Sequence, residues 1–127
     1  MASKQVVTFD NALEILLARV PEFGAHRSAT PDDDLVYPVF GEFARFLNDL
    51  LSRVPPAHPT VKRSFDLLNE MGNSEDKRIA HLTATGVFEI LTESQASIRA
   101  ARQLLYGRAL DWLEEMIRMW GVEVRDP

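Results

Sequence analysis

Apolar residues recur at helical spacing along almost the whole chain. Between Leu35 and Arg53 they stand three or four positions apart, which places them on one side of an α-helix. Strict alternation of apolar and polar residues, the mark of a half-buried strand, is absent apart from a few valine-containing ends. We therefore predict an all-α fold whose helices bury their apolar stripes against one another.

Residues that favour helix ends divide this pattern into five to six helices. Thr8 is a suitable N-cap for the first helix, and Gly72 suits a left-handed position after the third. Residues 95–120 fit one helix or two, and Gly107 favours a break near Tyr106. The first three expected helices cover residues 8–19, 35–53 and 59–71. Ser74 caps the next helical segment, and Ser94 caps the helical region over residues 95–120, which Gly121 ends.

The chain has the length and composition of one globular domain. It holds 127 residues, of which 46% are hydrophobic and 26% charged. We expect a single domain over residues 1–127, in three parts. Residues 1–34 form an N-terminal helix and an Asp-rich loop, residues 35–121 form the helical-hairpin core, and residues 122–127 form a loose tail.

A weak internal repeat relates the helices. Phe43, Phe65, Phe88 and Leu110 stand 22 or 23 residues apart, so two helices occupy about 45 residues, the length of a HEAT or armadillo unit. Antiparallel hairpins stacked as a HEAT-like right-handed array would join the apolar stripes into one core. A compact antiparallel bundle with short loops would repeat at the same spacing, so both arrangements stay open.

Acidic residues occupy the first and fifth positions after three of these anchors. Like charges at i and i+4 destabilise a helix by roughly 0.2 to 0.5 kcal/mol, so the core does not explain them. They are either solvated faces of an acidic protein or an electronegative surface that docks a basic partner. The candidate partner-binding residues are Asp66, Glu70, Glu89, Glu93, Asp111 and Glu115.

The sequence predicts no enzyme, cofactor or metal site. It contains no Cys, phosphate-binding glycine loop or nucleophile elbow, and His26, His58 and His81 lack the spacing of helical metal ligands. Asp32, Asp33 and Asp34 lack the pattern of a calcium loop and are better suited to capping a helix. Trp112, Met116 and Trp120 lie at helical spacing, which favours core positions over a ligand cage.

The net charge and the N-terminal residues limit the expected partners and the expected cellular location. A formal net charge of −5 disfavours nucleic acid and anionic membranes. The first residues, MASKQVV, lack the apolar run of a secretory signal, and no segment has the length of an apolar membrane span. We therefore expect a cytoplasmic protein with a basic protein partner.

Four segments resemble a small bacterial all-helical family of unknown function. They are residues 37–46 (YPVFGEFARF), 65–71, 86–92 and 106–110, so the resemblance covers the chain from Leu35 onward. It implies a HEAT-like helical domain without known catalytic residues. Small acidic proteins of this kind also include immunity proteins that cap a toxin, which is an analogy of fold and charge.

Three functional hypotheses follow. The first is a non-catalytic binding protein, most concretely an immunity or antitoxin-like protein that neutralises a basic toxin or effector through its acidic helical surface. The second is an adaptor or homo-oligomeric scaffold in which exposed Met119 and Trp120 pair two copies as a homodimer. An enzyme with an unrecognised metal or carboxylate site is a third and weaker hypothesis.

Overall fold

The computed structural model describes residues 6–26 and 35–125, and every regular element in these ranges is helical. This confirms the all-α prediction for the part of the chain that is described. The elements are α1 (Ala12–Arg19), α2 (Pro21–His26), α3 (Val36–Leu51), α4 (Pro59–Gly72), α5 (Lys77–His81), the π-helix η1 (Leu82–Phe88), α6 (Glu89–Leu91), α7 (Gln95–Leu104) and α8 (Gly107–Met119).

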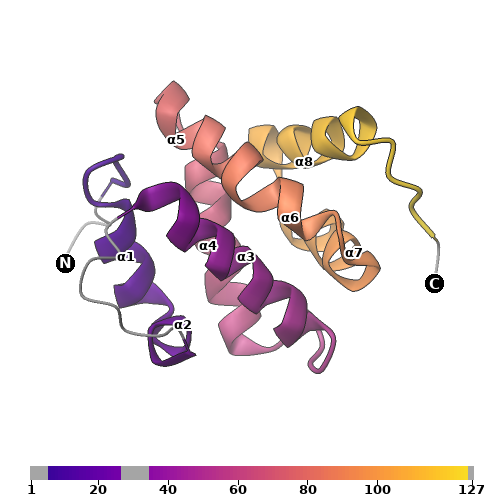
Figure 1. Ribbon diagram of the computed structural model, residues 1–127, viewed down its shortest axis with the longest axis horizontal. Helices are drawn as coiled ribbons and strands as arrows, with labels where there is room; N and C mark the ends of the chain where they lie inside the picture. Colours follow the sequence, from indigo (N-terminus) through magenta and orange to yellow (C-terminus); the bar gives the residue numbers. More distant parts are fainter. Residues whose placement is uncertain (1–5, 27–34, 126–127) are drawn as a thin grey trace.

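Helices α3 and α4 lie in the middle of the molecule, with α1 and α2 on one side and α7 and α8 on the other (Figure 1). One buried cluster joins them, and its largest fully buried side chains include Phe23 of α2, Phe43 of α3, Phe65 of α4 and Phe88 of η1. The rings of Phe23 and Phe43 meet edge to face at 5.4 Å between centroids. Three of the four predicted anchors are therefore buried, whereas Leu110 is only partly buried.

Polar side chains cap α4, α5 and α7, and of these caps only Ser94 was predicted. Ser94 Oγ accepts a hydrogen bond from the Ser97 amide at 3.2 Å and caps α7. Before α4, His58 Nδ1 accepts from the Thr60 amide at 3.2 Å, and Pro59 occupies the first helical position, where a missing N–H costs little. Asp76, rather than the predicted Ser74, caps α5 by accepting from the Arg78 amide at 2.9 Å.

The N-terminal segment differs from the prediction in two places. Thr8 lies in a turn before the first helix, where its amide donates to Asn11 Oδ1 at 2.7 Å, and α1 begins only at Ala12. Residues 21–26, expected to belong to the loop after the first helix, form α2, which adds one helical segment to the expected set. The predicted cap at Asp32–Asp34 lies outside the described residues.

Helices α5, η1 and α6 follow one another without a break from Lys77 to Leu91, and the wide π turn in their middle was not predicted. The Oγ1 atoms of Thr83 and Thr85 donate to the carbonyls of Ile79 and His81, each at 2.8 Å. These two bonds satisfy backbone acceptors where the helix changes register. η1 packs against α3 and α8, so it belongs to the core of the molecule.

Gly72 has a different role from the predicted one. It is the last residue of α4, and its φ is not positive. A Cβ at this position would lie 2.6 Å from the Cβ and 2.8 Å from the Cα of Ala109, so the missing side chain allows α4 and α8 to touch. The glycine is required by close packing and not by a left-handed turn.

The predicted break near Tyr106 is confirmed, since α7 ends at Leu104 and α8 begins at Gly107. Two asparagines of α4 hold this junction. Asn69 Nδ2 donates to the Leu104 carbonyl, and its Oδ1 accepts from the Tyr106 amide, both at 3.0 Å. Asn73 Oδ1 accepts from the Arg108 amide at 2.8 Å, and Gly107 takes a positive φ of 60° beside it.

The end of α8 confirms one prediction and corrects another. Gly121 has a φ of 59°, and the amides of Gly121 and Val122 donate to Arg118 and Ile117, as in a Schellman motif. The chain after it was expected to be a loose tail. Residues 122–125 are instead held to α7, because Gln95 donates to the Glu123 carbonyl at 2.7 Å and accepts from the Arg125 amide at 2.9 Å.

Candidate functional site

The predicted acidic positions of α4 face cations. Glu70 forms an ion pair with Arg19 of α1, with 2.9 Å between Nη2 and Oε1. This pair raises the pKa of the Arg19 guanidinium. Asp66, one turn earlier, is exposed and lines a hollow with Arg19 and Arg63. The carboxylates of α4 therefore help to hold α1 in place, and their negative charge is partly compensated.

The other four acidic positions lie on α8 and around α6. Glu89 begins α6 and is half-buried, whereas Glu93 follows that helix and is exposed. On α8, Asp111 is exposed and Glu115 pairs with Arg118. Asp111 and Glu115 line one hollow together, which contains none of the other four predicted residues. The structure thus brings one predicted pair into a shared hollow and leaves the three pairs in different surroundings.

The hollow on α8 is part of a larger strip that we term the α8 outer face. It consists of Arg108, Asp111, Trp112, Glu115 and Met119, which the helical period places within an arc of about 100°. The first four residues line the hollow, Trp112 is half-buried, and Met119 is 64% exposed. Trp120, the next residue, is 58% exposed.

These positions correct part of the prediction for the C-terminal aromatic residues. Met116 is buried as expected, and Trp112 is partly buried against the core. Trp120 was expected in the core and is exposed instead, because α8 ends at Met119 and Trp120 lies beyond the core-facing turns. Exposed tryptophan and methionine are enriched where proteins meet.

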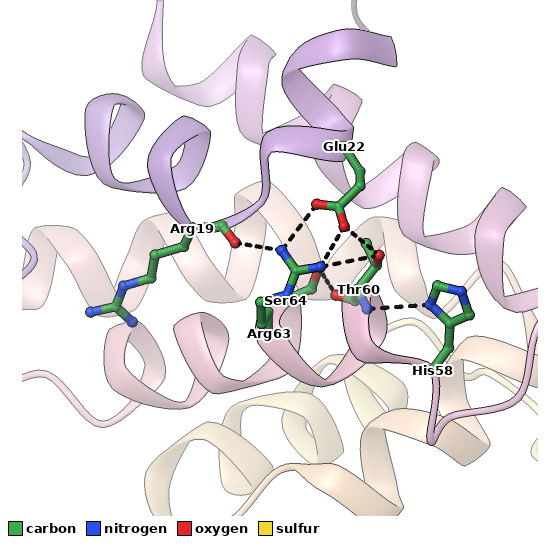
Figure 2. Close-up of polar contacts among 6 residues, drawn as sticks. All are labelled: Arg19, Glu22, His58, Thr60, Arg63 and Ser64. Atoms are coloured by element: carbon green, nitrogen blue, oxygen red, sulfur yellow. Dashed lines mark hydrogen bonds and ion pairs between the residues drawn. The ribbon is translucent and has the colours of Figure 1, made fainter.

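A polar network that the sequence did not predict joins α1, α2 and α4 (Figure 2). Arg63 of α4 donates to the Arg19 carbonyl at 3.1 Å and to the Glu22 carboxylate at 3.0 Å. Thr60 Oγ1 donates to the same carboxylate at 2.8 Å. Figure 2 shows the guanidinium of Arg19 pointing away from this network. That guanidinium pairs separately with Glu70. Arg63 therefore satisfies the carbonyl end of α1 and fixes α2.

The network strongly favours the ionised form of Glu22. The hydrogen bonds from Arg63 are the largest cause, with smaller contributions from the Glu22 backbone amide and Thr60, and they lower the pKa of Glu22 to about 2. Because the ordinary pKa is 4.5, the unfolded chain binds a proton at a higher pH than the folded chain. The stability that Glu22 contributes is thus complete above pH 4.5 and is lost as the pH falls toward 2.

This sign gives a prediction for the pH dependence of folding. We expect the free energy of unfolding to fall between pH 4.5 and pH 2, with about 1 kcal/mol of the loss due to Glu22, a value reduced by its 41% exposed side chain. A carboxyl NMR titration should show its low pKa directly, and Arg63→Gln should return that pKa toward 4.5. Arg53→Gln removes a surface pair with Asp49 and serves as the control. An unchanged Glu22 pKa in Arg63→Gln would contradict this account.

Two of the histidines have separate local roles. His58 caps α4, and His81 lies at the end of α5 beside Tyr37. Over residues 6–26 and 35–125, no group of three His, Cys, Asp or Glu side chains is arranged to hold a metal ion. In the same ranges no helix has both the length and the apolar character needed to cross a bilayer.

A family model described as a domain of unknown function, DUF7674, matches residues 13–121. The chain belongs to this family. The DUF7674 match begins within α1, before the segments whose resemblance starts at Leu35, and it ends at the glycine that closes α8. It therefore includes the network around Arg63 and the whole α8 outer face. No curated protein and no solved structure matches the chain.

Membership of DUF7674 agrees with the expectation of a family of unknown function. The relation to immunity proteins and the bacterial origin stay predictions. The polar network could not be found from sequence, because Glu22 and Arg63 are 41 residues apart and Glu22 lies in a segment expected to be loop. Helical spacing did contain the signal for the α8 outer face, since Arg108, Asp111, Glu115 and Met119 are three or four residues apart.

Proposed function

We propose that this member of DUF7674 is a non-catalytic, cytoplasmic protein-binding domain that docks a basic protein on the α8 outer face. The exposure of Met119 on this face, and of Trp120 directly after α8, carries the proposal, because Met and Trp are enriched at protein interfaces and Trp is common among their hot-spot residues. Asp111 and Glu115 lie along the same helix. They would steer a cationic partner toward the apolar contact and exclude acidic ones.

The charge of the chain supports a basic partner over nucleic acid or a membrane surface. The sequence pI is about 5.1 and the formal net charge is −5. The most concrete form of the proposal is an immunity or antitoxin-like protein that neutralises a basic toxin or effector by covering its surface. We also propose the HEAT-like stacked-hairpin arrangement for these helices, since such stacks present extended binding faces.

The experiment is capture of partners on the tagged full chain at low salt, followed by affinity measurements with the purified partner. We expect Met119→Ser with Trp120→Ser to weaken binding about 30-fold, as for hot-spot residues. Asp111→Lys should weaken it about tenfold, mainly through slower association. Asp66→Lys and Glu89→Lys make the same charge change elsewhere and should alter binding less than about twofold.

Each outcome decides a separate point. Equal losses in Asp66→Lys, Glu89→Lys and Asp111→Lys would show that net charge, and not the α8 outer face, attracts the partner. Binding that is insensitive to salt in all three variants would exclude the electrostatic mechanism. Full affinity after Met119→Ser with Trp120→Ser would overturn the docking site itself.

The second candidate function is a homo-oligomeric scaffold or adaptor, favoured by the same exposed Met119 and Trp120. A two-fold symmetric dimer would bury these residues against their copies. Light scattering at about 100 μM should then give a dimer mass that falls to the monomer mass in Met119→Ser with Trp120→Ser. A monomer at that concentration excludes this alternative, and a monomer that also captures no stoichiometric protein contradicts both functions.

A further inference from the structure

Another hollow, away from α8, lies where the turn before α1 meets the beginnings of α3 and α5. It has a volume of about 390 Å³ and is lined by Phe9, Tyr37, Lys77, Arg78 and His81. Its volume falls within the roughly 300 to 1,000 Å³ of small-molecule sites, but the hollow is open to solvent and not enclosed. The lining residues come from three separate segments of the chain, so the hollow exists only in the folded protein.

One side of the hollow is aromatic and fixed in orientation. The ring centroids of Phe9 and Tyr37 are 6.4 Å apart, and those of Tyr37 and His81 are 6.2 Å apart. The Tyr37 hydroxyl and His81 Nδ1 form a hydrogen bond of 2.8 Å, which holds both rings in place. Although it is held, Tyr37 keeps 38% of its surface exposed. A flat apolar group can therefore pack against rings that need no rearrangement.

The other side is cationic in a chain that is acidic overall. Lys77 and Arg78 line the hollow, and none of its lining residues is an Asp or Glu. In the described part of the chain, the Lys77 side chain has no hydrogen-bond or ion-pair partner. Arg78 lies over the Phe9 ring at 5.4 Å and contacts Asp76 at 3.4 Å, a long contact that leaves other N–H groups of the guanidinium available.

The hollow also adjoins the π-helix, which is an independent sign of a site. η1 begins directly after His81, and Thr85 Oγ1 donates to the His81 carbonyl at 2.8 Å. A Cβ added to Gly86 of η1 would meet the Tyr37 ring at 3.5 Å, so the wide turn lies against that ring. π turns are rare in helices and occur frequently at functional sites.

We propose that this hollow binds a small organic anion, a phosphate or carboxylate attached to a flat apolar ring. Lys77 and Arg78 bind the charged group through charge-assisted hydrogen bonds, and the ring packs against Phe9 and Tyr37. The site is separate from the α8 outer face, since the two share no lining residue. A failure of either proposal therefore leaves the other unaffected.

The experiment is an amide NMR titration of the full chain with phenyl phosphate. We expect saturable shifts centred on residues 9, 37, 77, 78 and 81. Inorganic phosphate lacks the ring and benzyl alcohol lacks the charge, so each should bind at least about tenfold more weakly. Lys77→Gln with Arg78→Gln should weaken phenyl phosphate about tenfold or more. Lys77→Gln alone removes a side chain without a described partner, and should weaken it about threefold with the fold intact.

Lys62→Gln with Arg99→Gln is the matched control, because it removes two exposed cations that do not line the hollow. This control should leave the affinity for phenyl phosphate unchanged. Equal affinity for inorganic phosphate would mean an adventitious ion only and would overturn the proposal. Equal losses in the control and the test variant, or no saturation up to about 20 mM, would overturn it as well.

Discussion

Gly72→Ala is expected to lower the free energy of unfolding by about 3 kcal/mol, the upper part of the usual range for overpacking. The new methyl group would lie 2.6 Å from the Cβ and 2.8 Å from the Cα of Ala109. The second of these atoms belongs to the backbone, so no side-chain rotation relieves the contact. Helices α4 and α8 must separate, which disturbs the buried residues on both. Urea unfolding of the purified variant measures the loss.

Gly41→Ala is the matched control for this prediction. Gly41 is also a buried helical glycine, but its added Cβ would lie 3.5 Å from Ile90 and 3.6 Å from Arg45, which is ordinary contact. The gain in helix propensity should then dominate and stabilise the protein by about 0.5 to 1 kcal/mol. Similar effects of the two substitutions would show that contact between α4 and α8 is not what requires Gly72.

Asn69→Ala should cost about 3 kcal/mol in the free energy of unfolding. Asn69 is 3% exposed, and its amide group satisfies both the Leu104 carbonyl and the Tyr106 amide at the break between α7 and α8. Removing it leaves two backbone groups without these partners, and each buried unsatisfied group costs about 1 to 3 kcal/mol. Thermal or urea unfolding gives the loss. Hydrogen exchange at Tyr106 should accelerate in parallel.

Asn73→Ala tests whether burial sets the size of this effect. Asn73 bonds the same junction, through the Tyr106 carbonyl at 3.1 Å and the Arg108 amide at 2.8 Å, but it is half-exposed. Water can replace its side chain, so we expect a loss of about 1 kcal/mol. A loss at Asn69 no larger than that at Asn73 would show that the buried hydrogen bonds of Asn69 do not determine the stability of the junction.

Apolar spacing, a capping serine and a glycine at a helix break correctly predicted the helices and helix ends that depend on nearby residues. The stripe from Val36 to Leu51 and the serine at position 94 led to α3 and to the start of α7. Gly107 led to the break before α8, and its positive φ shows why a glycine stands there. Gly72 misled the prediction, because a glycine at a helix end suits both a left-handed cap and a close helix contact. Only the position of Ala109 distinguishes them.

The π-helix left a signal in the sequence that the prediction did not use. In this segment the large apolar residues Leu82 and Val87 are five residues apart, where the stripe of a regular α-helix has steps of three or four. Both residues are fully buried, and Thr83 and Ala84 between them are buried as well. Contacts between distant segments, in contrast, leave no such signal in the sequence. The polar network of Arg63 and the hollow at Tyr37 each join segments about 40 residues apart, and no local pattern encodes such meetings.

Helices α5, η1 and α6 form one continuous rod from Lys77 to Leu91. The five-residue step in η1 keeps the buried sides of the two halves of this rod aligned. An α-helix advances about 100° per residue, so one extra residue would turn Val87 and Leu91 away from the side of Ile79 and Leu82. The wide turn absorbs that rotation, and all four residues remain fully buried. Chain length is therefore adjustable at η1 in a way that it is not elsewhere in the rod. Deletion of one residue within η1 would leave a regular α-helix with the same buried side. Deletion of one residue outside η1 would rotate one half of the rod out of the core.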